Sequence, residues 1–283
     1  MSIPSIEPSG GGVGAFVRDI YLNEAPAEET ITALRNGLGE YGVLFFRDQD
    51  ITPDNHAAFA GRFAKIKINR FFTPVEGYPM IAEVRKEPDQ KKNIGGGWHT
   101  DHSYDIEPAL GSMLLARETP PTGGDTIFAN MYSAYDSLSS GLQRTLEGLR
   151  ATHSSRHVFG PDAPRFKDKD NDVGDRLQNA KDAIQDSVHP LIITHPISGR
   201  KALYVNPGFT TGIEDWADTE SKALLDMLYE HAKQPEHSFR FQWKPGSIAF
   251  WDNRATWHYA VNDYHGARRL MHRITLEGAA LAA

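Results

Sequence analysis

The 283-residue sequence contains no cysteine. Disulfides, zinc fingers, iron–sulfur clusters and thiol catalysis are therefore excluded, and any bound metal must be held by histidine and carboxylate side chains. The sequence also has no apolar run of about 18 residues, the length that a membrane-spanning helix needs. Residues 1–14 lack the basic and apolar regions of a signal peptide. We therefore expect a cytoplasmic protein that makes no contact with a membrane.

A basic tract is missing as well, and 30 Lys and Arg residues against 37 Asp and Glu residues give a formal net charge of −7. Nucleic-acid binding would need clustered basic side chains to neutralise phosphates, so a nucleic-acid partner is not expected. With 40% hydrophobic and 24% charged residues, the composition excludes disordered, collagen-like and coiled-coil chains. We expect a small-molecule substrate and a homo-oligomer, either a dimer or a tetramer.

The first third of the sequence alternates helical and strand patterns. Apolar residues spaced by three and four predict a helix over 30–40, and the wholly apolar run 43–46 predicts a buried strand. Thr52 followed by Pro53 is typical of a helix N-terminus, so a second helix should begin there.

From residue 110 onward, short strand-like runs are separated by turn signals. Leucine spacing predicts two helices, over 142–149 and 219–228, on the outside of the sheets. The predicted fold is therefore mostly β with flanking helices, in a sandwich or jelly roll, as a single domain over 1–283 after a flexible glycine-rich N-terminus at 1–14. The predicted strands are 112–116, 126–129, 191–194, 202–205, 239–243 and 247–251.

Residues 162–186 form a charged segment, in which 12 of 25 side chains are charged with mixed sign. Two interpretations are open. The segment is either a solvated surface insert or a lid over a pocket.

His99 and Asp101 are candidate metal ligands because side chains at i and i+2 of a strand point to the same face. A third ligand is available in His258, which lies 157 residues beyond Asp101 and directly after an apolar run. Two imidazoles and one carboxylate are the ligand set of non-haem Fe(II) oxygenases, which leaves coordination positions open. Isolated histidines such as His56 and His153 are interpreted as surface or core groups.

A cluster of three arginines over residues 268–273 is the third chemical feature. In a strand, Arg269 and Arg273 share one face, whereas Arg268 lies on the other. The alternative is a solvated basic strand, but apolar flanks favour a strand inside the sheet, where arginine needs an anionic partner. Thr126 could add a hydroxyl donor to the same anion.

Together these residues resemble the TauD/TfdA family, which contains the taurine and 2,4-dichlorophenoxyacetate dioxygenases. The likeness extends from about residue 42 to residue 276, with the motifs in the family's order and spacing. The matching blocks are Trp98-His99-Thr100-Asp101, Gly123-Gly124-Asp125-Thr126, Thr194-His195-Pro196, residues 206–211, Trp251-Asp252-Asn253-Arg254 with His258, and Arg268-Arg269.

The resemblance implies a double-stranded β-helix, that is, a cupin-like jelly roll. It also implies Fe(II), 2-oxoglutarate as co-substrate and O2. In the family pattern, the metal is held by the candidate triad described above, and Thr126 and Arg269 hold the distal carboxylate of 2-oxoglutarate. Arg273 corresponds to the arginine that contacts the substrate sulfonate in taurine dioxygenases.

Two departures from the family pattern concern the substrate. Gly95 stands where taurine dioxygenases have an asparagine, four residues before the metal histidine, and Asn69 is aligned with their histidine near residues 68–70. Taurine is therefore not the expected substrate. Phe159 and Phe209 are candidate apolar contacts to the substrate, with a role in the core as the alternative.

The predicted function is that of an Fe(II)- and 2-oxoglutarate-dependent dioxygenase. It would hydroxylate a small anionic substrate, such as a sulfonate, a sulfate ester or an aryloxyalkanoate, and release succinate and CO2. Two alternatives are a biosynthetic tailoring hydroxylase or desaturase of the same family and a non-catalytic jelly-roll binding protein.

Overall fold

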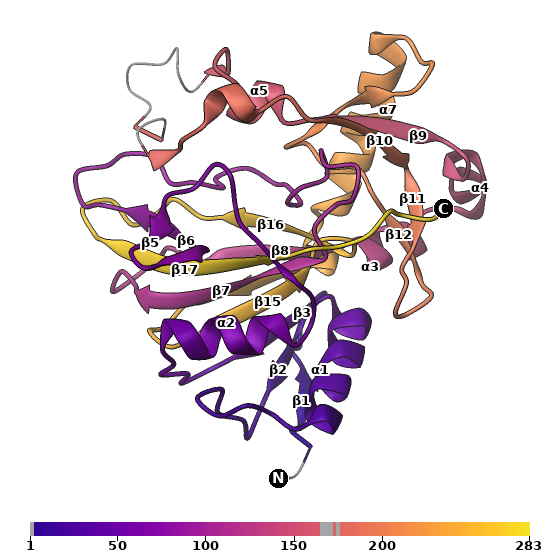
Figure 1. Cartoon of the computed structure of the whole chain (residues 1–283). Coiled ribbons are helices and arrows are strands. Elements are labelled where there is room, and N and C mark those ends of the chain that lie inside the picture. The colour runs from indigo at the N-terminus through magenta and orange to yellow at the C-terminus, as the bar shows by residue number, and fades with distance from the viewer. Residues whose placement is uncertain (1–2, 165–171, 174–175) are drawn as a thin grey trace.

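The computed structural model of the chain describes residues 3–164, 172–173 and 176–283. Two facing sheets form the centre of the molecule, and helices cover its outside (Figure 1). The strands are β1 (Ile6–Pro8), β2 (Ala15–Val17), β3 (Val43–Phe46), β4 (Ile66–Lys67), β5 (Pro74–Val75), β6 (Tyr78–Lys86), β7 (Gly111–Glu118), β8 (Thr126–Asn130), β9 (Arg150–Ser154), β10 (Asp186–Pro190), β11 (Ile192–Thr194), β12 (Lys201–Leu203), β13 (Thr210–Ile213), β14 (Ser238–Phe241), β15 (Ile248–Asp252), β16 (Thr256–Ala260) and β17 (Arg269–Leu276). The helices are α1 (Glu28–Tyr41), α2 (Pro53–Gly61), α3 (Met131–Asp136), α4 (Ser140–Leu146), α5 (Arg156–Phe159) and α7 (Asp218–Ala232), with short 3-10 turns at Ala180–Asp182 and Pro235–His237.

The larger sheet has the strand order β1-β2-β3-β15-β7-β17-β6-β5, and β4 pairs with β17 at the side. Its pairs are antiparallel except for β2 with β3. The smaller facing sheet has the order β14-β8-β16. Two further small sheets, β10-β9-β13 and β11-β12, complete a mostly β architecture, as the sequence predicts.

Strand β15 shows why the central strands read as continuous apolar runs. Ile248 and Phe250 face the cluster beneath helices α1 and α2, whereas Ala249 and Trp251 face the cluster between the two sheets. Both faces are buried, so none of the positions 248–251 needs a polar side chain. Strand β3 alternates in the same way, and the prediction of a buried strand over 43–46 is confirmed.

The start of helix α2 follows its predicted capping residue. Thr52 accepts a hydrogen bond from the Asn55 amide, and α2 begins at the following proline. Helix α1 begins two residues earlier than the predicted helix over 30–40 and ends one residue later. Figure 1 shows both helices against the outer face of the larger sheet.

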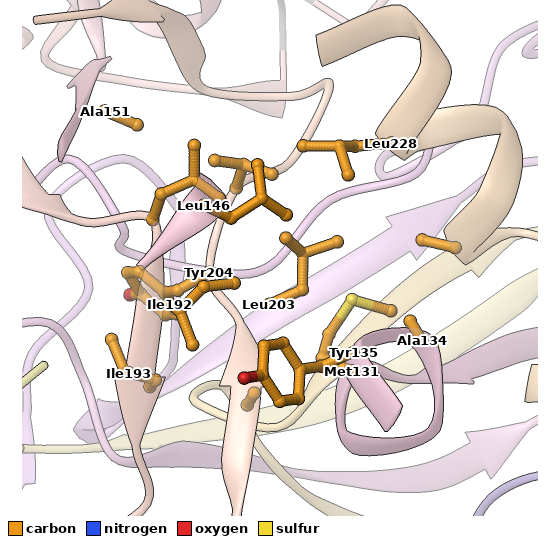
Figure 2. Packing of buried hydrophobic residues seen from close by; sticks show 14 of the residues in the cluster. Met131, Ala134, Tyr135, Leu146, Ala151, Ile192, Ile193, Leu203, Tyr204 and Leu228 are labelled. Atoms are coloured by element: carbon orange, nitrogen blue, oxygen red, sulfur yellow. The ribbon is translucent and has the colours of Figure 1, made fainter. Parts of the chain in front are cut away.

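A third apolar cluster lies where β11 and β12 meet α3, α4 and α7. Figure 2 shows Met131 and Tyr135 of α3 close to Leu203 of β12, with Leu228 of α7 and Leu146 of α4 on the far side of the cluster. Helices α4 and α7 thus pack outside the sheets, as expected.

The two ends of the charged segment 162–186 belong to the described residues, whereas residues 165–171 and 174–175 lie outside them. Leu177 forms a β-bridge with Phe72, and the amide of Gln178 donates to the Phe71 carbonyl. At the N-terminus, residues 6–8 of the segment predicted to be flexible pair with β2. None of the described helices is long and apolar enough to cross a membrane.

Candidate active site

A cavity of about 420 Å³ opens between the two sheets. Every residue that the sequence singles out as a candidate ligand or contact lines it. These residues are Asn69, Gly95, His99, Asp101, Thr126, Phe159, Phe209, His258, Arg269 and Arg273.

His99 and His258 are brought together by their own backbones. The His99 amide donates to the His258 carbonyl at 3.2 Å, and the His258 amide donates back to the His99 carbonyl at 2.8 Å. Residues that exchange both bonds lie directly opposite each other and point their side chains to the same face. The two imidazole rings accordingly lie 4.1 Å apart between centroids.

Asp101 completes the group from a turn rather than from a strand. His99 forms a single bridge, and the chain then turns at Asp101 and His102, whose φ is 59°. The carboxylate oxygens of Asp101 lie 3.7 Å from Nε2 of each histidine. The three ligand atoms all lie within 4.8 Å of one another, which is close enough to bind a single metal ion.

The protonation of this triad suits a metal. Nδ1 of His99 lies 2.8 Å from the Gly97 carbonyl and can only donate to it, so Nε2 is the ring nitrogen left to bind a metal. Burial and the neighbouring His99 lower the pKa of His258 well below its usual value. Burial raises the pKa of Asp101, but Arg273 and the two imidazoles outweigh burial and hold it below the usual range.

Arg269 is a buried cation with room for an anion. Its Nε donates to the Gly124 carbonyl at 3.1 Å, whereas Nη2 is buried and has no hydrogen-bond partner among the described residues. Burial lowers its pKa. Thr126 lies on the same side, where its hydroxyl accepts a hydrogen bond from the Trp243 indole at 3.0 Å.

Arg273 lies on the same strand face, four residues further along β17, as alternation predicts. Its Nη2 lies 2.8 Å from Oδ2 of Asp101 and 3.2 Å from the Ser112 hydroxyl. The rings of Phe72 and Trp251 flank the guanidinium at 5.6 and 5.9 Å.

The charged segment 162–186 contains several carboxylates that could neutralise Arg273. In the described part of that segment no carboxylate pairs with Arg273, and Asp101 is its partner instead. Arg268 points away from the cavity and pairs with Glu87 and Glu118.

The rest of the wall is aromatic and apolar. Phe71 stacks on Phe159 at 4.3 Å, and Phe209 meets the edge of His99 at 6.2 Å. Gly95 has a φ of 82°, and a Cβ there would lie 3.4 Å from the His99 ring. The Asn69 side chain accepts a hydrogen bond from the Phe71 amide at 3.0 Å, which orients it within the cavity.

Sequence reasoning missed a polar pair at the edge of the triad. His102 lines the cavity, and its Nδ1 lies 3.0 Å from Oδ2 of Asp105. Asp105 in turn pairs with Lys67 at 2.6 Å and Arg70 at 3.2 Å. A second histidine and a carboxylate three residues apart, directly after the predicted ligands, were the available signal.

A second missed group supports the turn that leads to His258. Asp252 is fully buried, and it accepts hydrogen bonds from Nε2 of His195 at 3.0 Å and from the Arg254 guanidinium at 2.6 Å. Its carbonyl accepts from the Thr256 hydroxyl at 2.7 Å. This network fixes the connection between β15 and β16, and hence the start of the strand that carries His258.

Comparison with known proteins agrees with this geometry. A family model described as "Taurine catabolism dioxygenase TauD, TfdA family" matches residues 5–275. The chain is 33% identical over 274 residues to an alkylsulfatase of Acinetobacter baylyi, covering 95% of this chain and 83% of the relative. It is 34% identical over 281 residues to an alpha-ketoglutarate-dependent 2,4-dichlorophenoxyacetate dioxygenase of Cupriavidus pinatubonensis, covering 92% and 93%. Pentalenolactone F synthase of Streptomyces avermitilis is 30% identical over 280 residues, covering 94% and 91%.

Solved structures show the same fold. A taurine dioxygenase from Burkholderia xenovorans matches with a TM-score of 0.82 and 31% identity, over 99% of this chain and 93% of that chain. AAD-2 in complex with Mn(II) and N-oxalylglycine matches with a TM-score of 0.81 and 28% identity, over 100% of each chain. The family implies a jelly-roll core, 2-oxoglutarate, O2 and a metal. This chain belongs to the TauD/TfdA family of 2-oxoglutarate-dependent dioxygenases.

Proposed function

We propose that this dioxygenase uses Fe(II), bound by His99, Asp101 and His258, to hydroxylate a small anionic organic substrate. The observation that carries the proposal is the triad itself: two imidazoles and one carboxylate whose ligand atoms lie within 4.8 Å of one another. This donor set suits an iron that keeps open positions for co-substrate and O2. When bound, the iron and 2-oxoglutarate would supply the oxidising chemistry, and the protein supplies geometry.

For 2-oxoglutarate, we propose that Arg269 and Thr126 hold the distal carboxylate. The guanidinium of Arg269 is buried and keeps Nη2 free of partners among the described residues, so an arriving carboxylate would satisfy it. The Thr126 hydroxyl already accepts from Trp243, which leaves its own hydrogen available to donate.

Charge balance supports an anionic prime substrate. A divalent metal, two guanidinium groups and the Asp101 carboxylate together carry three positive charges, and 2-oxoglutarate removes two. One positive charge then remains in a buried cavity, where an unpaired charge is costly. The nearby carboxylate Asp125 is already paired with Arg240, so a monoanionic substrate next to Arg273 would neutralise the site.

The shape of the cavity favours an alkyl or aryl body on that anion. Phe159, Phe209 and Phe72 provide apolar wall, and Gly95 provides no side chain that could bind an amine. Sulfate esters and aryloxyalkanoates therefore fit better than taurine, in line with the alkylsulfatase and 2,4-dichlorophenoxyacetate relatives. Hydroxylation of the carbon next to a sulfate or ether oxygen would give a product that breaks down to a carbonyl compound.

The direct test has two stages. Anaerobic addition of Fe(II) and then 2-oxoglutarate should produce a weak visible charge-transfer band. A panel of sulfonates, sulfate esters, aryloxyalkanoates and amino acids is then compared by succinate formation coupled to product. Absence of the band with folded protein would refute the metal and co-substrate assignment.

A biosynthetic tailoring role is the second candidate, and the similarity to pentalenolactone F synthase favours it. It uses the same metal and co-substrate residues, so products must distinguish the two. A hydroxylated or fragmented product supports the first role, and an alkene or ring-modified product supports the second. The non-catalytic alternative gains no support, because the metal triad and both arginines are retained.

Three further expectations complete the proposal: a cytoplasmic location, a single domain over 1–283, and a homo-oligomer. The first two rest on the composition and the motif order of the sequence. Light scattering of the purified protein would determine the oligomeric state.

A further inference from the structure

His102 is an unassigned polar group in the wall of the active-site cavity. It follows Asp101 directly and has a φ of 59°, a left-handed conformation that few non-glycine residues adopt. The Asp105 amide donates to the His102 carbonyl at 3.0 Å and closes the turn. Backbone strain of this kind persists where the surroundings hold it, and it often occurs at functional sites.

Asp105 fixes the orientation of the His102 ring. Its carboxylate lies 3.0 Å from Nδ1 of His102, and it also pairs with Lys67 and Arg70. Two cations thus already neutralise this carboxylate. A carboxylate can only accept here, so Nδ1 carries the hydrogen, and in this tautomer Nε2 is left as an acceptor.

The second ring nitrogen, Nε2, is unpaired. No polar atom of the described residues forms a hydrogen bond with Nε2 of His102. The residue as a whole is 2% exposed and lines the cavity together with Asn69 and Tyr104. The unpaired nitrogen thus belongs to a buried side chain in the wall of the cavity in which the substrate must lie.

We propose that Nε2 of His102 accepts a hydrogen bond from a hydroxyl group of the prime substrate. The substrate would then carry two recognised groups, an anion that binds at Arg273 and a hydrogen-bond donor that binds at His102. This inference rests on the proposed function. Arg273 and His102 line the same cavity, and Asp101, which pairs with Arg273, is the chain neighbour of His102, so one small molecule can contact both.

Discrimination follows from the cost of an unsatisfied acceptor. A substrate analogue without the donor would cover Nε2 and leave it without a partner in a water-poor site, which costs about 1 to 3 kcal/mol. A site built for such a hydrogen bond rejects the analogue that lacks it, whereas an apolar wall does not discriminate strongly.

The test uses probes that differ by one hydroxyl group. The pairs are 3-hydroxypropane-1-sulfonate with propane-1-sulfonate, and (4-hydroxyphenoxy)acetate with phenoxyacetate. Binding of each is measured by calorimetry under anaerobic conditions to enzyme loaded with Fe(II) and 2-oxoglutarate. In the wild type, the hydroxylated member of at least one pair should bind about tenfold or more tightly.

The key variant is His102→Asn, because asparagine tolerates the left-handed backbone but is too short to reach as far as Nε2. It should abolish the preference for the hydroxylated probe and leave the affinity for 2-oxoglutarate and the unfolding temperature nearly unchanged. The matched control is His265→Asn, which changes an exposed histidine and should retain the wild-type preference.

Two results would overturn the inference: no preference within either pair in the wild type, or a preference that survives in His102→Asn. Failure of the proposed function gives a different result, because 2-oxoglutarate would then not bind to the Fe(II)-loaded wild type. The affinity for 2-oxoglutarate, measured first, separates the two failures.

Discussion

Replacing Arg269 with lysine tests the proposed co-substrate site most directly. Lysine keeps the charge but loses the planar fork whose Nη2 is free among the described residues. A charge-assisted hydrogen bond contributes roughly 1.5 to 3 kcal/mol, so the Kd for 2-oxoglutarate should rise by roughly 10- to 150-fold. Anaerobic titration of the charge-transfer band gives that Kd.

The free energy of unfolding of the protein should respond differently to a change at the same position. In the free enzyme, Arg269 is 5% exposed, and among the described residues only its Nε has a hydrogen-bond partner. Arg269→Met removes a costly buried cation but also leaves the Gly124 carbonyl without its donor. These effects oppose each other, so the free energy of unfolding should change by less than about 1 kcal/mol while 2-oxoglutarate binding is lost.

The matched control is Arg268→Met, which removes an arginine on the opposite strand face that pairs with Glu87 and Glu118. It should leave the Kd for 2-oxoglutarate unchanged. If Arg269→Lys binds 2-oxoglutarate as tightly as the wild type, the assignment is refuted. If Arg269→Met instead unfolds with a loss of several kcal/mol, Arg269 has a structural role that the contacts do not reveal.

Three further predictions concern the metal, the substrate and pH. Alanine at His99, Asp101 or His258 should abolish tight Fe(II) binding, measured by metal analysis after dialysis, with little change in the circular dichroism spectrum; full metal content in Asp101→Ala would contradict the triad. Arg273→Ala should raise the KM for the best anionic substrate and spare the Kd for 2-oxoglutarate; an unchanged KM, or a neutral best substrate, would contradict the anionic-substrate proposal. Burial lowers the pKa of His56 from 6.5 to about 3. The unfolded chain therefore takes up a proton that the folded chain does not, and stability should fall as the pH drops from about 6.5 toward 3. His56→Leu should flatten part of this loss of Tm with falling pH, and an unaltered profile would contradict it.

The sequence predicts the two faces of a strand well, because the burial of each face determines whether its residues are apolar or polar. The alternation in β17 correctly separates Arg269 and Arg273 from Arg268. The predicted helix over 142–149 is too long, because Gly148 adopts a φ of 89° and α4 ends at Leu146. Leucine spacing continues past that point, but a left-handed residue cannot continue an α-helix.

The candidate site is predictable in residue type but not in arrangement. His99 and His258 meet through a two-residue backbone pairing across 159 positions, which no local periodicity records. The turn at Asp101 and His102 depends on a positive φ in a residue that usually avoids it, so a strand was the natural local prediction. The resemblance to a family supplied the long-range pairing that residue patterns alone could not.

The contact between Arg273 and Asp101 changes how the charge of the site should be understood. From the sequence, each buried arginine is expected to need an anionic partner. Arg273 already has one in the protein itself, because its Nη2 lies 2.8 Å from Oδ2 of Asp101. The same oxygen lies 3.7 Å from Nε2 of His258, so one carboxylate faces both the metal position and the substrate arginine. A bound metal would withdraw charge from that carboxylate and weaken its hold on Arg273, because both compete for the same electrons. Arg273 should therefore attract an anion more strongly when the metal is bound. The order of binding follows from this geometry: an anionic substrate should bind more weakly to metal-free protein than to protein loaded with Fe(II) and 2-oxoglutarate, even though the arginine is present in both.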